Sequence, residues 1–153
     1  MRVALLILVP LLAAGCMSSP GGLGFAGDRG VQEPFYKEYR EILAGEHHKD
    51  FVIPVEAGAN VVNVSVSLRS RAEGIPLPNT VPAQLHVTLL APDGSALDEA
   101  SLDARAPDAN LTANDVPPGQ YLARVDGLGA SQPVDGQEYG ASYVLATEVT
   151  YTG

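Results

Sequence analysis

The chain has 153 residues, with 18 acidic and 9 basic side chains, a formal net charge of −9 and one cysteine. A single cysteine excludes an intramolecular disulfide, so a domain of this length must be stabilised by burial of its apolar side chains. The acidic balance argues against nucleic acid or an anionic lipid surface as a direct partner of the domain, because both attract basic surfaces. The length fits one domain with a substantial core.

The first sixteen residues are typical of an export signal. Arg2 supplies a positive charge, residues 3–14 are apolar, and small residues precede Cys16. The apolar run is shorter than the roughly 20 residues that span a bilayer, so we expect a signal peptide at residues 1–15. The residues that end at Cys16 resemble the lipobox of prokaryotic lipoproteins, although Ala13 stands where leucine is commonest. The resemblance implies that Cys16 carries diacylglycerol and becomes the mature N-terminus, and the alternative is an ordinary signal peptide that is cut nearby.

A tether and a helix are expected next. Residues 16–32 are rich in glycine and serine, which indicates a flexible tether between the anchor and the domain. Residues 33–46 carry a helical periodicity, with Pro34 in a suitable first turn and Gly45 as a C-terminal stop. The apolar side chains that recur there at three- and four-residue spacing are Phe35, Tyr39, Ile42 and Leu43. We therefore expect a short amphipathic helix over 33–46 that docks on the following domain.

From residue 47 to residue 153 the sequence predicts a β-sandwich domain. Apolar and polar residues alternate most clearly over 62–68, as they do in a strand with one buried face. Turn sequences with proline, aspartate and glycine separate this segment from the others. The remaining strand segments are 51–55, 85–89, short stretches near Leu97, Leu102 and Leu111, and then 121–125 and 143–151. About seven or eight short strands predict a single antiparallel, jelly-roll-like sandwich in an all-β fold.

Four segments carry a family resemblance. In order and spacing, residues 51–59, 85–94, 118–125 and 141–145 resemble the bacterial and archaeal pre-peptidase C-terminal domains and related jelly-roll sandwiches. Members of that family are non-catalytic modules appended to secreted enzymes, so the resemblance implies accessory binding rather than chemistry. The Pro-Gly-x-Tyr segment also has a mechanical interpretation, in which Tyr121 fills the edge of the sandwich and leaves its hydroxyl free to bond a loop backbone.

Residues that commonly carry catalysis are sparse, and we expect no enzyme. The sequence has no Gly-x-Ser-x-Gly nucleophile motif, no phosphate-binding loop and no dinucleotide fingerprint. His47 and His48 are adjacent, and adjacent side chains of a strand point to opposite faces. This favours an exposed, titrating pair over a metal site. His86 is predicted to face solvent, because it alternates with the apolar residues of its strand.

No cofactor is expected, with calcium as the one alternative. Seven oxygen-bearing side chains occur in and near the predicted turns, namely Asp93, Asp98, Glu99, Asp103, Asp108, Asn110 and Asp115. Ca²⁺ prefers such ligands, but their spacing matches neither an EF-hand nor a nonapeptide repeat. A role in forming turns is therefore favoured over a calcium site.

Two further pairs of residues are candidates for modification and contact. Asn63 and Asn110 each begin an Asn-x-Ser/Thr pattern, which makes them candidate glycan acceptors. Asn63 falls on the polar face of its predicted strand, where a glycan has room. Arg69 and Arg71 open a Pro- and Gly-rich loop, 69–82, in an otherwise acidic protein, which makes this loop a candidate contact surface.

The sequence therefore predicts a lipoprotein on the extracytoplasmic face of the cell membrane, anchored through Cys16, with one non-catalytic binding module. Its ligand is a carbohydrate, a peptide or a partner protein. Besides the arginine loop, the polar loop at 131–140 is a candidate contact surface. The alternative from a different class is a structural subunit of a cell-surface assembly. A hydrolase accessory domain with a Ca²⁺ site is the less favoured interpretation.

Overall fold

A computed structural model describes residues 34–71, 83–129, 132–134 and 137–152, all within one compact unit, Gln32–Gly153. The predicted signal peptide (1–15), the lipidation site Cys16 and the tether lie outside the described residues. In the described part of the chain, no helix has the length and apolar character that crossing a membrane requires.

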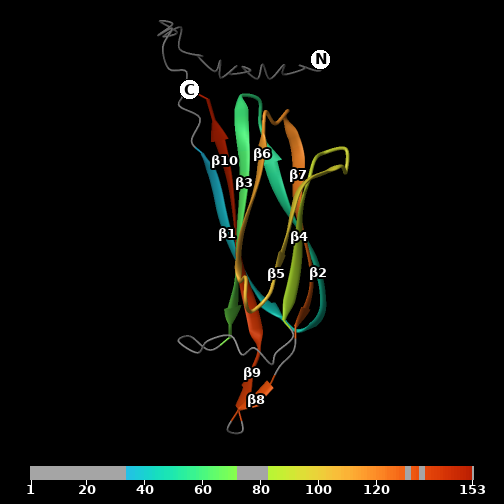
Figure 1. The fold of residues 1–153 in the computed structure, drawn as a ribbon. Coiled ribbons are helices and arrows are strands. Elements are labelled where there is room, and N and C mark those ends of the chain that lie inside the picture. Colours follow the sequence, from blue (N-terminus) through green and yellow to red (C-terminus); the bar gives the residue numbers. More distant parts are fainter. Residues whose placement is uncertain (1–33, 72–82, 130–131, 135–136, 153) are drawn as a thin grey trace, which may run out of the picture. The chain divides into compact units, whose positions relative to one another are not determined.

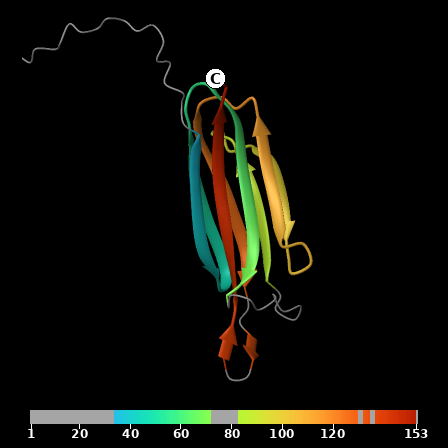
Figure 2. The ribbon, with the colours of Figure 1, turned by 90° about the vertical axis from the view of Figure 1, so that its left-hand side faces the viewer.

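Two antiparallel sheets of four strands form the domain (Figures 1 and 2). Sheet A has the order β1-β10-β3-β6, and its strands are β1 (Phe35–Leu43), β10 (Ala141–Tyr151), β3 (Ala59–Ser70) and β6 (Asp108–Asn114). Sheet B has the order β2-β7-β4-β5, and its strands are β2 (Gly45–Val55), β7 (Gly119–Gly129), β4 (Gln84–Leu90) and β5 (Ala96–Leu102). The prediction of an all-β, antiparallel sandwich is confirmed.

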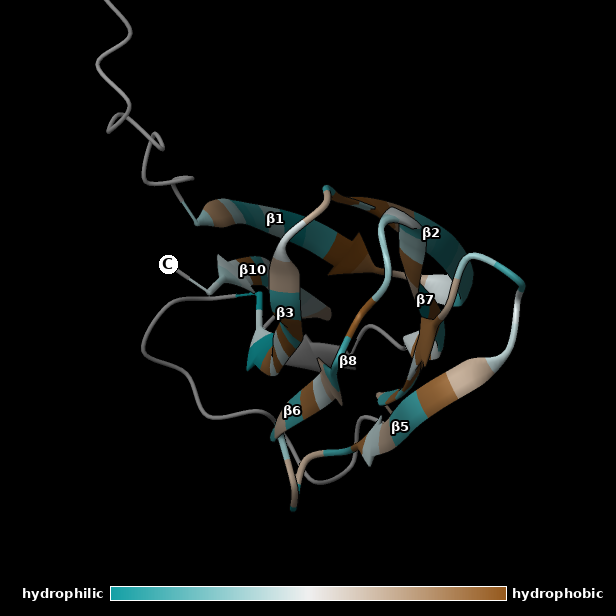
Figure 3. Ribbon diagram, turned by 90° about the horizontal axis from the view of Figure 1, so that it is seen from above, coloured by the Kyte–Doolittle hydropathy of each residue, from teal (hydrophilic) through white to brown (hydrophobic). Residues whose placement is uncertain are grey.

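The strand order is that of a jelly roll. The chain passes from sheet A to sheet B between β1 and β2, returns for β3, and crosses again between most of the later strands. Consecutive strands thus lie mainly in opposite sheets, as they do in a double-sheet jelly roll of eight strands. A viewer looking along the strands sees the two sheets edge-on, with hydrophobic and hydrophilic residues alternating along them (Figure 3).

The prediction of a helix over residues 33–46 is wrong. Its described residues form β1, which pairs with β10 from Phe35 to Leu43, and the start of β2. A spacing of four does not distinguish a helix from a strand, because residues four apart lie on one face of either element. Phe35, Tyr39 and Leu43 therefore all face the core, whereas Ile42 is 55% exposed. Gly45 ends no helix: it is the first residue of β2, and its positive φ of +58° suits glycine where the chain turns from β1 into β2.

Two predicted loops also change. The polar loop at 131–140 contains a short antiparallel hairpin of β8 (Gln132–Val134) and β9 (Gln137–Tyr139). The other predicted loop, 69–82, starts inside a strand, because β3 continues to Ser70. Residues 72–82 of that loop lie outside the described residues.

The core lies between the inner faces of the two sheets. The alternating segment of β3 fills its centre, and the four side chains that it buries are Val62, Val64, Val66 and Leu68. From sheet B, Tyr121 is 1% exposed and donates its hydroxyl hydrogen to the carbonyl of Pro117, 2.9 Å away. The predicted bond from this tyrosine to a loop backbone is thereby confirmed, and it ties the turn between β6 and β7 to the core.

Candidate functional site

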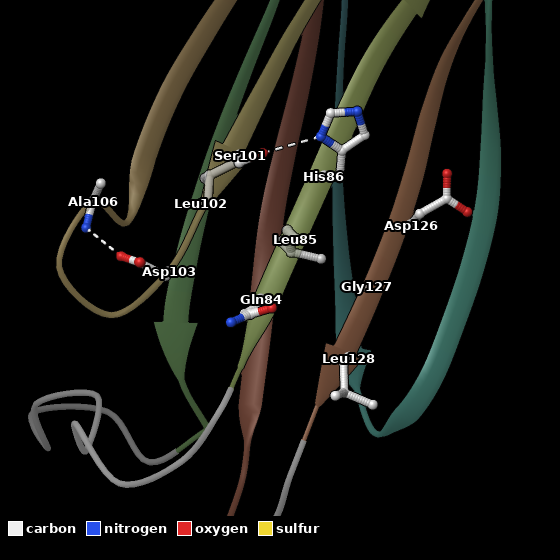
Figure 4. A pocket seen from close by; sticks show the side chains of 10 residues that line it. All are labelled: Gln84, Leu85, His86, Ser101, Leu102, Asp103, Ala106, Asp126, Gly127 and Leu128. Carbon is white, nitrogen blue, oxygen red and sulfur yellow. Dashed lines mark hydrogen bonds between the residues drawn. The ribbon is translucent and has the colours of Figure 1, made fainter.

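The outer face of sheet B carries a row of polar side chains at one level of the register. Read from β2 to β5, the row is His48, Asp126, His86 and Ser101. A cavity of about 500 Å³ lies beside it, lined by residues of β4, β5, β7 and the turn after β5 (Figure 4). Histidine, serine and aspartate in one row are the residue types of a nucleophilic site, so their geometry decides whether catalysis is feasible.

The row separates into two pairs. His48 Nδ1 lies 2.5 Å from Asp126 Oδ1, and His86 Nδ1 lies 3.1 Å from Ser101 Oγ. His86 leans toward Ser101 rather than toward Asp126 (Figure 4). The His48 side chain is 60% exposed and that of His86 is 46% exposed, so water reaches both imidazoles. An activated nucleophile needs a base that a third group orients in a site that excludes water, and this open sheet face does not exclude water.

The predicted opposition of the two adjacent histidines is confirmed, but only one of them is exposed. His47 points inward and is half-buried, with Nε2 2.8 Å from the hydroxyl oxygen of Tyr143. His48 points outward to Asp126. Over the described ranges, no group of three His, Cys, Asp or Glu side chains is arranged to hold a metal ion. His86 faces solvent as predicted.

An ion pair occupies the next level of sheet B. Arg124 donates from Nε to Asp50 Oδ1 at 2.9 Å and from Nη2 to Asp50 Oδ2 at 3.1 Å. The hydrogen bonds from Arg124, together with its positive charge, hold the pKa of Asp50 below its ordinary value of 3.8, against a smaller opposing effect of burial. The histidine and charged side chains at the centre of this face are thus engaged with one another.

Replacing Arg124 with glutamine is expected to lower the free energy of unfolding near neutral pH only slightly, because the side chains of Arg124 and Asp50 are 40% and 33% exposed and water screens the pair. Since the folded-state pKa of Asp50 is depressed, the pair stabilises the fold above pH 3.8. That contribution is lost as pH falls through the folded-state pKa. Urea unfolding at about pH 7 and about pH 2 should therefore show a difference between wild type and Arg124→Gln that is smaller in acid. A difference of equal size at both pH values would contradict this expectation.

The outer face of sheet A, whose strands are seen in Figure 2, carries a groove, which we call the sheet-A groove. It has a volume of about 430 Å³. Its lining residues come from all four strands and are Tyr36, Asn63, Ser65, Asn110, Thr112, Ala146 and Glu148. Two levels of the register build it: one crosses the sheet as Tyr36, Glu148, Asn63 and Thr112, and the next as Glu38, Ala146, Ser65 and Asn110. The small side chains at the middle of the second level, Ala146 and Ser65, leave the hollow.

The polar side chains of this groove are only partly engaged. Thr112 Oγ1 donates to Asn63 Oδ1 at 3.0 Å. Within the described residues, the side chains of Ser65, Asn110 and Glu148 have no hydrogen-bond partner. This differs from the centre of sheet B, where histidines and charges are paired. Hydrogen-bonding capacity on sheet A is therefore available to a ligand.

The structure brings both predicted glycan acceptors into this groove. Asn63 and Asn110 lie on the neighbouring strands β3 and β6, where Asn63 pairs in register with Thr112 and Ser65 with Asn110. Sequence reasoning missed Tyr36, which is 62% exposed at the groove, because residues 33–46 were interpreted as a helix. A period of two applied to that segment would have placed Tyr36 and Glu38 on one outward face.

Arg69 and Arg71 lie elsewhere, at one end of sheet A. Arg69 Nη2 is 3.4 Å from Asp108 Oδ1, and the two side chains are 56% and 60% exposed. The backbone N–H of Arg71 donates to the carbonyl of Gly140 at 2.8 Å. The base of the arginine loop therefore adjoins the end of the 131–140 segment, so the two candidate contact loops start from neighbouring positions.

Two of the acidic residues considered for calcium, Asp93 and Asp103, serve the backbone of turns. Asp93 accepts from the N–H and hydroxyl of Ser95, and Asp103 accepts from the N–H groups of Arg105 and Ala106. These hydrogen bonds lower the pKa of both carboxyls. On β5, Asp98 Oδ2 accepts from the backbone N–H of Thr112 at 3.0 Å and so links the two sheets at their edges. The geometry of Asp93 and Asp103 agrees with the turn-forming role.

Comparisons with known proteins give limited similarity. No protein-family model matches the chain, and no curated protein matches it. The crystal structure of the infectious bursal disease virus VP2 subviral particle aligns with a TM-score of 0.42 and 10% identity, over 77% of this chain and 33% of that chain. The structure of the Gx strain of the same virus aligns with a TM-score of 0.33 and 13% identity, over 77% of this chain and 32% of that chain. The structure of the Gt strain aligns with a TM-score of 0.23 and 11% identity, over 80% of this chain and 39% of that chain. This chain thus spans about a third of the length of the viral chains that it matches.

Proposed function

We propose that this chain is a lipid-anchored protein of the extracytoplasmic membrane surface whose sandwich is a non-catalytic binding module. One observation supports the binding role. Among the described residues, the side chains of Ser65, Asn110 and Glu148 in the sheet-A groove have no intramolecular hydrogen-bond partner. Binding sites combine a concave surface with a few polar groups that a ligand can satisfy. The groove has both properties, and its volume of about 430 Å³ is within the usual range for a ligand site.

The exposure of the only His-Ser pair on sheet B supports a non-catalytic role. His86 and Ser101 are in hydrogen-bond contact, but they lie on an open sheet face with the imidazole 46% exposed. Glu99 Oε2 is 3.6 Å from His86 Nε2, and the Glu99 side chain is 68% exposed. A carboxylate in that position orients an imidazole poorly, because water competes for both groups.

The sequence around Cys16 supports the membrane anchor. A diacylglycerol group on this residue supplies two acyl chains, and stable anchoring requires two lipid signals because a single chain binds only marginally. The glycine-rich residues 16–32 then give the domain reach from the bilayer. A groove on the outer face of a sheet suits such a position, since it remains open to large ligands.

The anchor is tested by metabolic labelling with palmitate in the producing cell. The wild-type protein is expected to incorporate the label, and Cys16→Ser is expected to lose all of it, because the chain has one cysteine. Ser19→Ala is the matched control and should remain labelled. Intact-mass analysis should give a mature N-terminus at Cys16 with a lipid attached. An unmodified N-terminus beyond Cys16 would contradict the proposed anchor.

The binding role is tested by sedimentation with washed cell envelopes. Purified protein is expected to be retained, and the double variant Asn110→Ala with Glu148→Ala to be retained less. Leu97→Ala, an exposed substitution on sheet B, should behave as wild type. Equal retention of all three proteins would show that the groove takes no part in binding.

A further inference from the structure

The shape of the sheet-A groove follows from the side chains of β3 and β10. Ala146 and Ser65 are neighbours in register and form its floor, because their side chains are too short to fill the space above the sheet. On the edge strand β1, Tyr36 forms one wall. The opposite side is formed by Asn110 and Thr112 of the other edge strand, β6. The groove therefore extends across the sheet, between its two edges, and is open to solvent.

Tyr36 contributes an exposed aromatic ring. Its side chain is 62% exposed, and its hydroxyl donates to Glu38 Oε2 on the same strand at 3.4 Å. An isolated aromatic ring at the rim of a polar groove offers an apolar face next to hydrogen-bonding groups. A pyranose ring matches this combination, since its C–H groups form an apolar face and its hydroxyls form a polar rim.

The remaining groups of the groove fit the polar rim of such a ring. Asn110 has an amide that donates and accepts, Ser65 has a hydroxyl that does both, and Glu148 has a carboxylate that accepts. Among the described residues none of the three is engaged elsewhere. Planar amides and carboxylates can bond two adjacent hydroxyls at once, which fixes the orientation of a sugar.

The charge of the groove selects the class of sugar. Glu148 lines it, and its lining residues include no lysine, arginine or histidine, whereas Glu38, at the level of Ala146, is paired with Arg40 at 3.1 Å. Carboxylates repel uronic acids and sulfated sugars, and the desolvation of a like-charged pair adds to the cost. A neutral saccharide carries no such penalty.

We propose that the sheet-A groove binds a neutral glycan chain, with Tyr36 stacked on one sugar ring and Ser65, Asn110 and Glu148 bonded to its hydroxyls. This proposal rests on the binding role proposed above and names the ligand class of the same groove. It excludes N-glycosylation of the groove, because a glycan attached at Asn63 or Asn110 would occupy the space that the ligand needs.

Isothermal titration of the full-length purified protein tests the proposal. The probes are cellohexaose and N-acetylchitohexaose as neutral chains, and polygalacturonate as a charged chain. We expect a neutral hexasaccharide to bind and polygalacturonate not to bind. Tyr36→Ala is expected to weaken binding about tenfold or more, because a central aromatic contact commonly dominates a binding site. Tyr36→Phe keeps the ring and should stay within about twofold of wild type.

Matched variants separate binding from folding. Leu97→Ala removes an exposed side chain from sheet B and should leave the affinity unchanged. Asn110→Ala, on an exposed edge-strand position, provides a second loss of affinity that does not depend on Tyr36. Glu148→Gln keeps the hydrogen-bonding oxygen but removes the charge, and it should permit weak binding of polygalacturonate. The melting temperature of each variant shows whether it is folded.

Four outcomes would overturn the glycan proposal: binding of neither neutral hexasaccharide, full affinity in folded Tyr36→Ala, equal binding of polygalacturonate by the wild type, or a glycan found on Asn63 or Asn110. Retention of the wild type on envelopes through a protease-sensitive component, without glycan binding, would overturn the glycan ligand and leave the general binding role standing. Loss of palmitate label concerns the anchor alone, because the titration does not depend on it.

Discussion

Replacing Tyr143 with alanine is expected to lower the free energy of unfolding by about 3–5 kcal/mol, the usual cost of truncating a buried aromatic side chain. Tyr143 is fully buried between the sheets. Its ring meets those of His47 and Phe51 edge-on, with centroid separations of 5.4 and 6.4 Å. Removing it leaves a cavity at the place where β10 of sheet A faces β2 of sheet B. Urea unfolding followed by circular dichroism measures the loss.

Tyr143→Phe is the matched control, because it keeps the ring and removes only the hydroxyl bonded to His47 Nε2. It is expected to cost about 1 kcal/mol, the net value of one hydrogen bond. Burial, and secondarily the charge of Glu41, raise the pKa of Tyr143 well above its ordinary value of 10.0. Its neutral form is therefore favoured in the folded state, and wild-type stability should fall above pH 10.0 more steeply than that of Tyr143→Phe. An alanine variant as stable as the phenylalanine variant would contradict the role of the ring.

Gly129→Ala is expected to destabilise the protein by about 3 kcal/mol, the upper end of typical overpacking costs. A Cβ at this position would lie 2.5 Å from the carbonyl carbon of Leu43 and closer still to its oxygen. Both atoms belong to the backbone, so they cannot rotate away as a side-chain end would. Gly129 pairs with Gly45, and the chain crosses from sheet A to sheet B at this point. The added methyl group would push the end of β1 away from β7.

Gly45→Asn is the comparison for this substitution. Gly45 has a positive φ of +58° but open space around its Cα, and asparagine tolerates that backbone conformation. Thermal unfolding should therefore show a much larger drop in melting temperature for Gly129→Ala than for Gly45→Asn. Equal drops would mean that backbone conformation, rather than the close approach of Leu43, makes glycine necessary at this crossing.

The strands with one clearly alternating face were predictable. In β3, alternation over residues 62–68 identified the strand and its buried face, and the structure buries the same four side chains. Tyr121 and its bond to a turn carbonyl were predictable from the Pro-Gly-x-Tyr sequence. These features depend on local pattern, in which period and turn chemistry agree.

The first strand was not predictable by the same method. Phe35, Tyr39 and Leu43 are spaced by four, which fits one face of either a helix or a strand. Pairing with β10, at the far end of the chain, decides between them, because nine backbone partners there stabilise the extended form. Tertiary context overrides a local helical pattern in such cases.

By itself, the sequence determined the all-β class, the antiparallel sandwich and most strand positions, because these depend on hydrophobic period and turn residues. The tertiary structure alone decided which distant residues share a face. Tyr36, Glu148, Asn63 and Thr112 form one row of the sheet-A groove only through the register of four strands. The same register sets His86 beside Ser101 on the other sheet. Register is a property of long-range pairing, and no local pattern specifies which strand becomes the neighbour of another.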